Sequence, residues 1–228
     1  MFKIETKDLI LRDIQKSDLQ KHLYWLTQET EWWNWDAACW YLLELSEEQR
    51  KIEIEKLMHG LEGFLEMISN KSADDTRYSF QIEEKVSGEY IGYISCYCID
   101  SDFNATDEED LYAFGIDIPE TKFRGKGYGE QAFSAAIKYY KSKGIDEVYT
   151  QTWSGNKPMI RLAEKVGFEL ISVRKNLREH NGKKYDALTF RILVGRRVKM
   201  IEFKKPSDFP KGTFYNQLAE TILIMRLC

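Results

Sequence analysis

The sequence predicts an α+β fold with one mixed, mostly antiparallel twisted sheet of about seven strands and helices on both faces. Three observations lead to this prediction. Apolar residues alternate with polar ones over several short segments, which is typical of strands. Ser87-Gly88 and Asn181-Gly182 mark two hairpin turns. A strand, a glycine-rich loop, a helix and a second strand then follow one another over residues 111–152, which indicates one parallel crossover.

The amino-terminal part combines one strand with two helices. Residues 9–12 are predicted to form the first strand, and Ser17 to cap a helix that ends near Leu26. Ser46 precedes a second helix, whose apolar residues recur at helical spacing as far as Ile68. The remaining expected elements are strands at 78–82, 90–99 and 111–118, a helix at 131–143, a strand at 147–152, a helix at 157–165 ended by Gly167, and two strands around Asn181-Gly182.

Length and composition favour one domain with an addition. The chain has 228 residues, of which 43% are apolar and 31% charged, so it can bury a sizeable core and still present a charged surface. Residues 1–194 are expected to form the domain. Residues 195–228 are expected to add a strand and a short apolar helix, which either docks on its own sheet or contacts a second copy in a homodimer.

Several classes of protein receive no support from the sequence. A net charge of −4 gives no reason to expect a nucleic-acid partner, and no apolar run reaches the roughly 18 residues that a membrane span needs. Four cysteines without paired spacing, and no signal-type stretch after Met1, favour a cytoplasmic location. The three histidines have no carboxylate or cysteine at ligand spacing, so no metal site is expected.

The segment Arg124-Gly125-Lys126-Gly127-Tyr128-Gly129 is the clearest candidate for a binding site. Its three glycines allow close backbone approach, and it leads into a helix whose first N–H groups have no partner within the helix. A helix start of this kind binds anions, and two cationic side chains add positive charge. The segment therefore predicts a site for phosphate or pyrophosphate.

Spacing excludes two common phosphate motifs. The P-loop needs Lys and then Ser or Thr after its last glycine, but Glu130 and Gln131 follow Gly129. The dinucleotide fingerprint needs a third glycine where Glu130 stands. The pattern that fits is [Arg/Gln]-x-x-Gly-x-Gly, with Arg124, Gly127 and Gly129 in the named places.

That pattern resembles the coenzyme A loop of the GNAT superfamily of N-acetyltransferases. The order of segments on both sides of the loop is also similar, and the opening residues 9–19 resemble the ribosomal-protein alanine acetyltransferase-like (RimJ/RimL-type) branch. The resemblance covers roughly residues 5–193. Its other pieces are Ile116-Asp117-Ile118-Pro119-Glu120, the strand at 147–152, Asn156, and Glu164-Lys165-Val166-Gly167-Phe168.

The resemblance implies acetyl-CoA as co-substrate, with no metal, and transfer of the acetyl group to a primary amine by direct attack. The strand before the loop would pair with the pantetheine and the loop amides would hold the pyrophosphate. Asn156 would reach the pantetheine arm, cap the next helix, or do both. The implied cofactor-binding residues are Ile116, Ile118, Arg124, Gly125, Lys126, Gly127, Tyr128, Gly129 and Asn156.

The groups that transfer protons are harder to assign. Some relatives place a glutamate where this chain has Ala113, and a tyrosine or serine where it has Met159 or Ala163. Asp117 points to the same strand face as Ala113 and is the candidate catalytic base. A water-relayed mechanism, or one that relies on substrate positioning, is the alternative.

For the acceptor, an aromatic cluster and acidic residues favour a cation. Trp33 and Asp36, in the cluster between the two amino-terminal helices, are the candidate substrate-binding residues. Together with the acidic loop at 100–110 they favour a small polyamine, an aminoglycoside-like molecule or a protein N-terminus. The alternative is that the tryptophans are part of the hydrophobic core and that the acidic loop is simply solvated. The rival function is a non-catalytic acyl-CoA-binding regulatory or scaffold protein on this fold, which the residues at 113, 159 and 163 favour.

Overall fold

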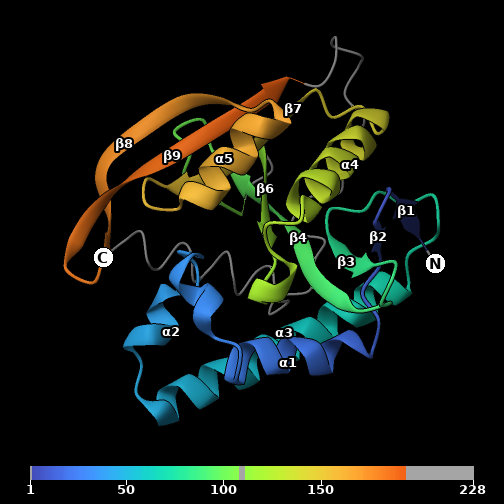
Figure 1. The fold of residues 1–228 in the computed structure, drawn as a ribbon, viewed down its shortest axis with the longest axis horizontal. Helices are drawn as coiled ribbons and strands as arrows, with labels where there is room; N and C mark the ends of the chain where they lie inside the picture. The colour runs from blue at the N-terminus through green and yellow to red at the C-terminus, as the bar shows by residue number, and fades with distance from the viewer. Residues whose placement is uncertain (1, 108–110, 194–228) are drawn as a thin grey trace.

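The computed structural model describes residues 2–107 and 111–193, and in this part of the chain nine strands form one sheet (Figure 1). The strand order is β1-β2-β3-β4-β6-β7-β9-β8, with β5 paired to β4. Neighbouring strands are antiparallel except β6 and β7, which run parallel. The strands are β1 (Lys3–Glu5), β2 (Leu9–Arg12), β3 (Phe80–Glu84), β4 (Tyr90–Ile99), β5 (Ala105–Thr106), β6 (Leu111–Asp117), β7 (Glu147–Trp153), β8 (Glu169–His180) and β9 (Lys183–Leu193).

The predicted fold class is confirmed, whereas the predicted strand number of about seven was too low. The two strands that the sequence analysis did not identify are β1, with three residues, and β5, with two. Segments this short hold too few residues to show an alternating pattern, so only their pairing with β2 and β4 defines them.

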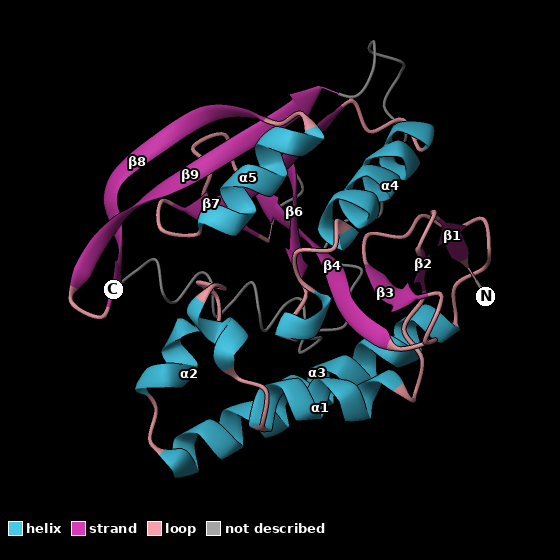
Figure 2. Cartoon of the chain, in the orientation of Figure 1, coloured by secondary structure: helices cyan, strands magenta, loops and turns pink. Residues whose placement is uncertain are grey.

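Helices cover both faces of the sheet, as Figure 2 shows. On one side lie α1, η1 and α3, and on the other lie α4 and α5. Their bounds are α1 (Asp18–Thr27), η1 (Glu31–Asn34), α2 (Trp40–Glu44), α3 (Glu47–Ser69), η2 (Thr121–Phe123), α4 (Tyr128–Ser142) and α5 (Lys157–Val166). The two 3₁₀ helices and α2 are too short for their apolar residues to show helical spacing.

Local signals at the element ends were correct in most cases. Ser46 forms a complete capping box with Gln49 at the start of α3. Asn181 and Gly182 both adopt positive φ, 51° and 68°, as a two-residue hairpin turn requires. Ser17 is the exception: α1 begins after it, but its side chain makes no capping bond, and the carboxylate of Asp18 accepts the N–H of Gln15 instead.

Two hydrophobic cores lie on opposite faces of the sheet. The first joins β2, β3, β4 and β6 to α4 and α5, and at its centre the rings of Phe114 and Tyr140 stack with centroids 4.0 Å apart. The second packs α1, η1 and α3 around Trp25 and against Tyr93 of β4. Because full burial of such side chains contributes roughly 1.5–3 kcal/mol each, the two cores stabilise the packing of the sheet between two helical layers.

Two expectations concern the whole chain. The segment at 195–228, expected to add a strand and a helix, lies outside the described residues. Within the described residues, no helix is long and apolar enough to cross a membrane.

Candidate active site

A cavity of 720 Å³ opens where the parallel strands β6 and β7 separate. These strands are paired only at Ala113 and Tyr149, and beyond that pair no residue of β7 is in register with β6. Residues 115–118 therefore line the cavity on one side, and residues 151–153 line it on the other. A parallel sheet that opens at the carboxyl ends of its strands provides unpaired backbone groups in a concave site.

The glycine-rich loop forms one end of this cavity, which we call the donor end. Gly125 and Gly127 have φ of 73° and 80°, in the left-handed region that favours glycine. A Cβ added at either position would have no atom within 4 Å, so both glycines face open space. Gly127 is also the N-cap of α4, which begins at Tyr128, three residues earlier than the spacing predicted. The loop thus presents free N–H groups and the positive end of a helix to the cavity, which fits a phosphate group.

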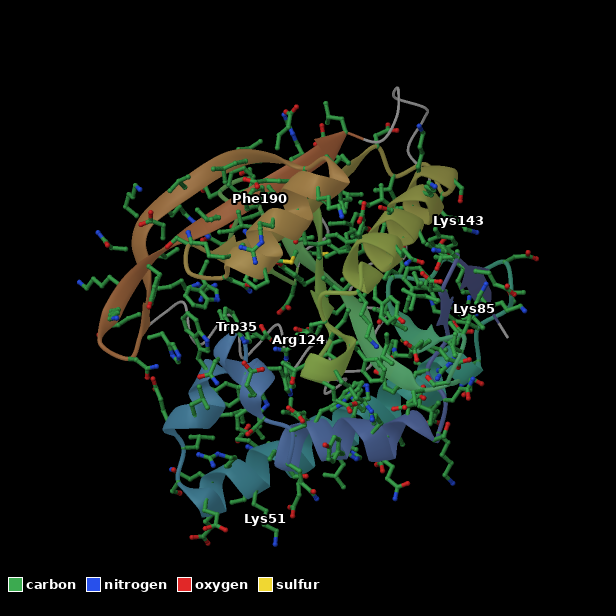
Figure 3. The ribbon with its side chains drawn as sticks, in the orientation of Figure 1. Trp35, Lys51, Lys85, Arg124, Lys143 and Phe190 are labelled. Carbon is green, nitrogen blue, oxygen red and sulfur yellow. The ribbon has the colours of Figure 1, made fainter. Side chains whose placement is uncertain are left out.

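Arg124 lines the cavity, but its guanidinium is occupied by protein partners. Its Nε donates to the carbonyl of Ile118 at 2.8 Å, and Nη2 donates to the carbonyl of Pro119. Its Nη1 pairs with the Glu31 carboxylate at 2.7 Å, and Glu31 also accepts the Trp35 indole N–H at 2.7 Å. Arg124 therefore ties the end of β6 to η1, and Figure 3 labels it close to Trp35.

The side chains of Lys126 and Tyr128 are also engaged with the protein. The Lys126 ammonium lies 5.4 Å from the ring centroid of Phe123 and 5.7 Å from that of Tyr128, and Lys126 does not line the cavity. The Tyr128 hydroxyl donates to Glu84, and this bond raises the pKa of Tyr128 to about 12. Of these two residues, only Tyr128 lines the cavity, where it opens α4.

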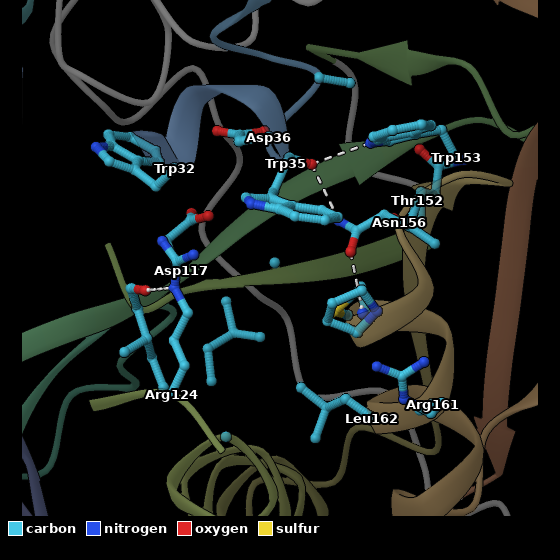
Figure 4. Close-up of a pocket in the computed structure, with 18 of the residues that line it drawn as sticks. Trp32, Trp35, Asp36, Asp117, Arg124, Thr152, Trp153, Asn156, Arg161 and Leu162 are labelled. Atoms are coloured by element: carbon cyan, nitrogen blue, oxygen red, sulfur yellow. Dashed lines mark hydrogen bonds between the residues drawn. The ribbon is translucent and has the colours of Figure 1, made fainter. Parts of the chain in front are cut away.

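Asn156 connects the helix after β7 to the aromatic segment. Its Oδ1 accepts the N–H of Met159 at 3.1 Å, so it caps α5 as its position predicts. Its Nδ2 donates to the carbonyl of Trp35 at 3.0 Å, and the same carbonyl accepts the indole N–H of Trp153 at 3.0 Å (Figure 4). These two bonds hold the backbone of Trp35 in the cavity wall beside β7 and α5.

The opposite end of the cavity, which we call the acceptor end, holds two carboxylates. Asp117 ends β6, and Asp36 lies in the loop after η1. Burial, and then the charge of Asp36, raises the pKa of Asp117 well above its ordinary value, against a hydrogen bond from Tyr93. Burial also raises the pKa of Asp36, although Ala38 N–H and the Cys39 thiol donate to it at 3.0 and 3.4 Å. The two acids lie close enough to influence each other, so one of them keeps its proton more readily than an isolated carboxyl.

The aromatic cluster divides between core and cavity. Trp33 is only 2% exposed, packs in the helical core and is absent from the cavity wall. Trp32 and Trp35 line the cavity instead. η1 is about one turn of 3₁₀ helix, so Trp32 and Trp35, three residues apart, lie on one side of it and Trp33 points elsewhere. The sequence alone did not show which tryptophan faces the site.

Several residues of the cavity wall were not singled out from the sequence. Arg161 and Lys165 of α5 lie on the donor side, and Lys165 pairs with Glu130 at 2.7 Å. The acceptor end adds Tyr97, Gln151, Arg174 and Arg178, of which the two arginines come from β8. The signal that could have found the arginines is their spacing of four, which places both on one face of a strand.

The positions that relatives fill with proton-transfer groups remain apolar here. Ala113 and Ala163 are completely buried, and Met159 lines the cavity. Asp117 is therefore the carboxylate that reaches the cavity from β6. Over residues 2–107 and 111–193, no group of three or more His, Cys, Asp or Glu side chains could hold a metal ion.

The sheet opens between two parallel strands, and a glycine loop at a helix start lies beside the opening. The family model described as an acetyltransferase (GNAT) domain matches residues 8–169, which is more than half of the chain. The protein belongs to this family.

Two known proteins with sequences similar to parts of this chain are described as N-acetyltransferases. An N-acetyltransferase 9-like protein of Caenorhabditis briggsae is 29% identical over 126 residues, 53% of this chain and 63% of the relative. The human alpha/beta-tubulin-N-acetyltransferase 9 is 33% identical over 88 residues, 37% of this chain and 42% of the relative. The chain thus aligns with less than two thirds of either relative.

Solved structures share the fold. A spermidine N-acetyltransferase from Vibrio cholerae, in complex with coenzyme A and spermine, superposes with a TM-score of 0.58 at 17% identity. The superposition covers 83% of this chain and 97% of the other. At this identity the likeness establishes the architecture of the domain, and the chemistry has to be argued from this chain's own residues.

Proposed function

We propose that the protein transfers the acetyl group of acetyl-CoA to a primary amine by direct attack of the amine on the thioester. The observation that carries this proposal is the cavity between β6 and β7, with a glycine loop at a helix start at one end and a half-buried carboxylate at the other. Such a cavity can hold the two reactants end to end, which removes much of the entropic cost of bringing them together.

At the donor end, the loop from Gly125 to Gly129 supports binding of the pyrophosphate through backbone N–H groups. The glycines leave the space that a phosphate needs, and Arg124 holds the loop against the end of β6. Backbone groups of Ile116 and Ile118, which line the cavity, are available to pair with the pantetheine. The thioester carbonyl would then lie beside β6, where a backbone N–H can stabilise its developing negative charge.

At the acceptor end, Asp117 is the proposed base. An alkylammonium with a pKa near 10 is neutral in only about one molecule per thousand at pH 7, so removal of its proton accelerates the reaction. A carboxyl whose pKa is raised by burial and by Asp36 is a better base than an ordinary aspartate. When ionised, the same pair attracts the ammonium group to the cavity before the transfer.

The acceptor classes expected from the sequence are a small polyamine, an aminoglycoside-like molecule or a protein N-terminus. Similar proteins include a spermidine N-acetyltransferase and a tubulin N-acetyltransferase. By their names, one acts on a small amine and the other on a protein, so the similarity supports both classes of acceptor. All of these acceptors present a primary amine, and this group is what the acid pair recognises.

The proposal is tested by measuring acetyl-CoA binding and then thiol release over a panel of amines. We expect binding by calorimetry, and amine-dependent release of free thiol. Binding without release on any amine would instead support a non-catalytic acyl-CoA-binding protein, which the apolar residues at 113, 159 and 163 favour. Absence of binding would contradict both functions.

A further inference from the structure

Two arginines of β8 enter the acceptor end from an irregular part of the strand. The register between β8 and β9 shifts between Arg174 and Arg178, where Arg174 faces Ala187 and Arg178 faces Tyr185. Three residues of β8 therefore oppose one residue of β9, Asp186, which is a bulge. Asp186 holds this bulge by accepting the N–H of Asn176 at 3.1 Å. Bulges of this kind redirect side chains, and both arginines line the cavity.

Arg174 is fixed by the loop before β6. Its Nη1 donates to Oδ1 of Asn104 at 2.6 Å, and Nη2 donates to the carbonyl of Phe103 at 3.0 Å. Its Nε is buried and has no hydrogen-bond partner among the described residues. The acidic loop that was expected to attract a cation therefore positions a cation of the protein: Asp100 accepts the N–H groups of Asp102 and Asn104 and shapes the turn that holds Arg174.

The backbone of Arg178 pairs with Tyr185 of β9, but its guanidinium makes no hydrogen bond or ion pair with any described residue. Burial, and to a smaller extent the positive charge of Arg174, lowers the pKa of Arg178, against the influence of Tyr97 and Asp36, which raises it. A guanidinium has five donors and stays charged, so a half-buried one without a partner is unfavourable unless an anion binds to it. Asp36 influences the pKa of both Arg178 and Asp117, and all three side chains belong to the wall of the same cavity.

The acceptor end thus holds both signs of charge. Asp117 and Asp36 suit an ammonium group, and Arg178 suits an anion. A polyamine would satisfy the acids, but it would bring further positive charge towards two arginines. A molecule with an amine and an anionic group separated by a few atoms satisfies both.

We propose that the acceptor is an amine that carries an anionic group close to its nitrogen, with Arg178 binding the anion while Asp117 and Asp36 receive the amine. This inference rests on the proposed acetyl transfer. Two sources provide the chemistry: a free amino acid with its carboxylate, or a peptide N-terminus followed by an acidic side chain. In both, the amine nitrogen forms the new bond to the acetyl carbon, the thiolate of coenzyme A leaves, and the amine proton passes to Asp117.

The test uses the full chain, saturating acetyl-CoA and matched acceptors in a thiol-release assay. The amino-acid arm compares an α-amino acid with its amide. The peptide arm compares peptides with Asp or Asn at the second residue. Spermidine represents the polyamines. We expect the anionic member of at least one pair to have a kcat/KM about tenfold or more above its neutral partner and above spermidine, and the arm that shows this identifies the source.

Variants then assign the effect to one residue. Arg178→Met should raise KM for the anionic acceptor about tenfold or more and leave the neutral acceptor unchanged, whereas Arg178→Lys should restore part of the preference. Lys184→Met is the matched control, because Lys184 is exposed on the same hairpin and outside the cavity wall. Unchanged affinity for acetyl-CoA shows that each variant is folded.

Different results contradict the inference and the proposed function. Turnover that prefers spermidine or the neutral partners would overturn the anionic acceptor and leave acetyl transfer standing. An equal loss on anionic and neutral acceptors in Arg178→Met would also overturn it. Acetyl-CoA binding without turnover on any amine contradicts the proposed acetyl transfer itself.

Discussion

The two ends of the cavity are built in different ways. The phosphate site proposed at the donor end is one continuous segment, residues 124–129, and depends on the conformation of its backbone. The acceptor end collects side chains from four separate parts of the chain: Asp36 after η1, Tyr97 of β4, Asp117 of β6, and Arg174 and Arg178 of β8. A backbone site of this kind depends on local sequence, whereas a side-chain site depends on the packing of distant elements.

This difference separates what the two ends can do. A donor site made of N–H groups and a helix start binds phosphate with little dependence on side chains. An acceptor site made of charged side chains can be changed one residue at a time, so one fold can serve many amines. Arg124 connects the two ends, because it holds the loop to β6 and reaches Glu31 beside Trp35.

The largest effect should come from the proposed base. Asp117→Asn keeps the shape of the side chain but removes its ability to accept the proton, so kcat/KM should fall roughly 10²–10⁴-fold while the acetyl-CoA affinity stays unchanged. Asp74→Asn is the matched control, since Asp74 is exposed and outside the cavity wall. A fall of less than twofold in Asp117→Asn would assign the proton transfer to water or to substrate positioning.

A smaller effect is expected at the donor end. In the double variant Gly125→Ala/Gly127→Ala, two methyl groups enter the space proposed for phosphate, and the Kd for acetyl-CoA should rise about tenfold or more, or about 1.4 kcal/mol. The control is Gly88→Ala/Gly182→Ala, because these glycines have the same positive φ and the same open surroundings in turns away from the cavity. Equal weakening in both double variants would show that backbone strain alone is responsible.

The acid pair predicts a shift in pH dependence. The charge of Asp36 raises the pKa of Asp117, so Asp36→Asn should lower it. A base acts only when deprotonated, and activity is lost as the pH falls through its pKa. The acid limb of kcat/KM should therefore move to lower pH in Asp36→Asn. The ratio of variant to wild type on the same amine, measured from pH 5 to 9, removes the titration of the substrate. If the acid limb does not move in Asp36→Asn, the charge of Asp36 does not affect the group that titrates in catalysis.

The smallest effect should come from the ion pair that joins the two ends. Glu31→Gln weakens the contact with Arg124, and because exposed ion pairs contribute at most about 1 kcal/mol, kcat/KM should fall no more than about fivefold. Glu53→Gln, which removes the exposed pair with Lys56, is the control. Measuring both the Kd for acetyl-CoA and the KM for the amine shows which end responds. If neither constant changes, the bonds of Arg124 to the carbonyls of Ile118 and Pro119 are sufficient to hold it, and the ion pair with Glu31 is not needed.

Elements with strong local signals were predicted well. The β2 strand, the capping box of α3, the Asn156 cap and the Asn181-Gly182 turn all depend on a few neighbouring residues, and the structure shows them where the sequence indicated. Strands of two or three residues and 3₁₀ helices were missed, because their existence depends on pairing partners far along the chain.

By itself, the sequence determined the fold class, the family resemblance and the glycine loop. These features depend on periodicity, on turn-forming residues and on glycines, all of which can be recognised in consecutive residues. The tertiary structure alone decided which charges meet. It placed Asp36 and Asp117 in the wall of one cavity, packed Trp33 in the core, and used the loop before β6 to position Arg174. The physical reason is that a charged side chain acts over a few ångströms in space, and no local pattern encodes which distant residues will lie within that range.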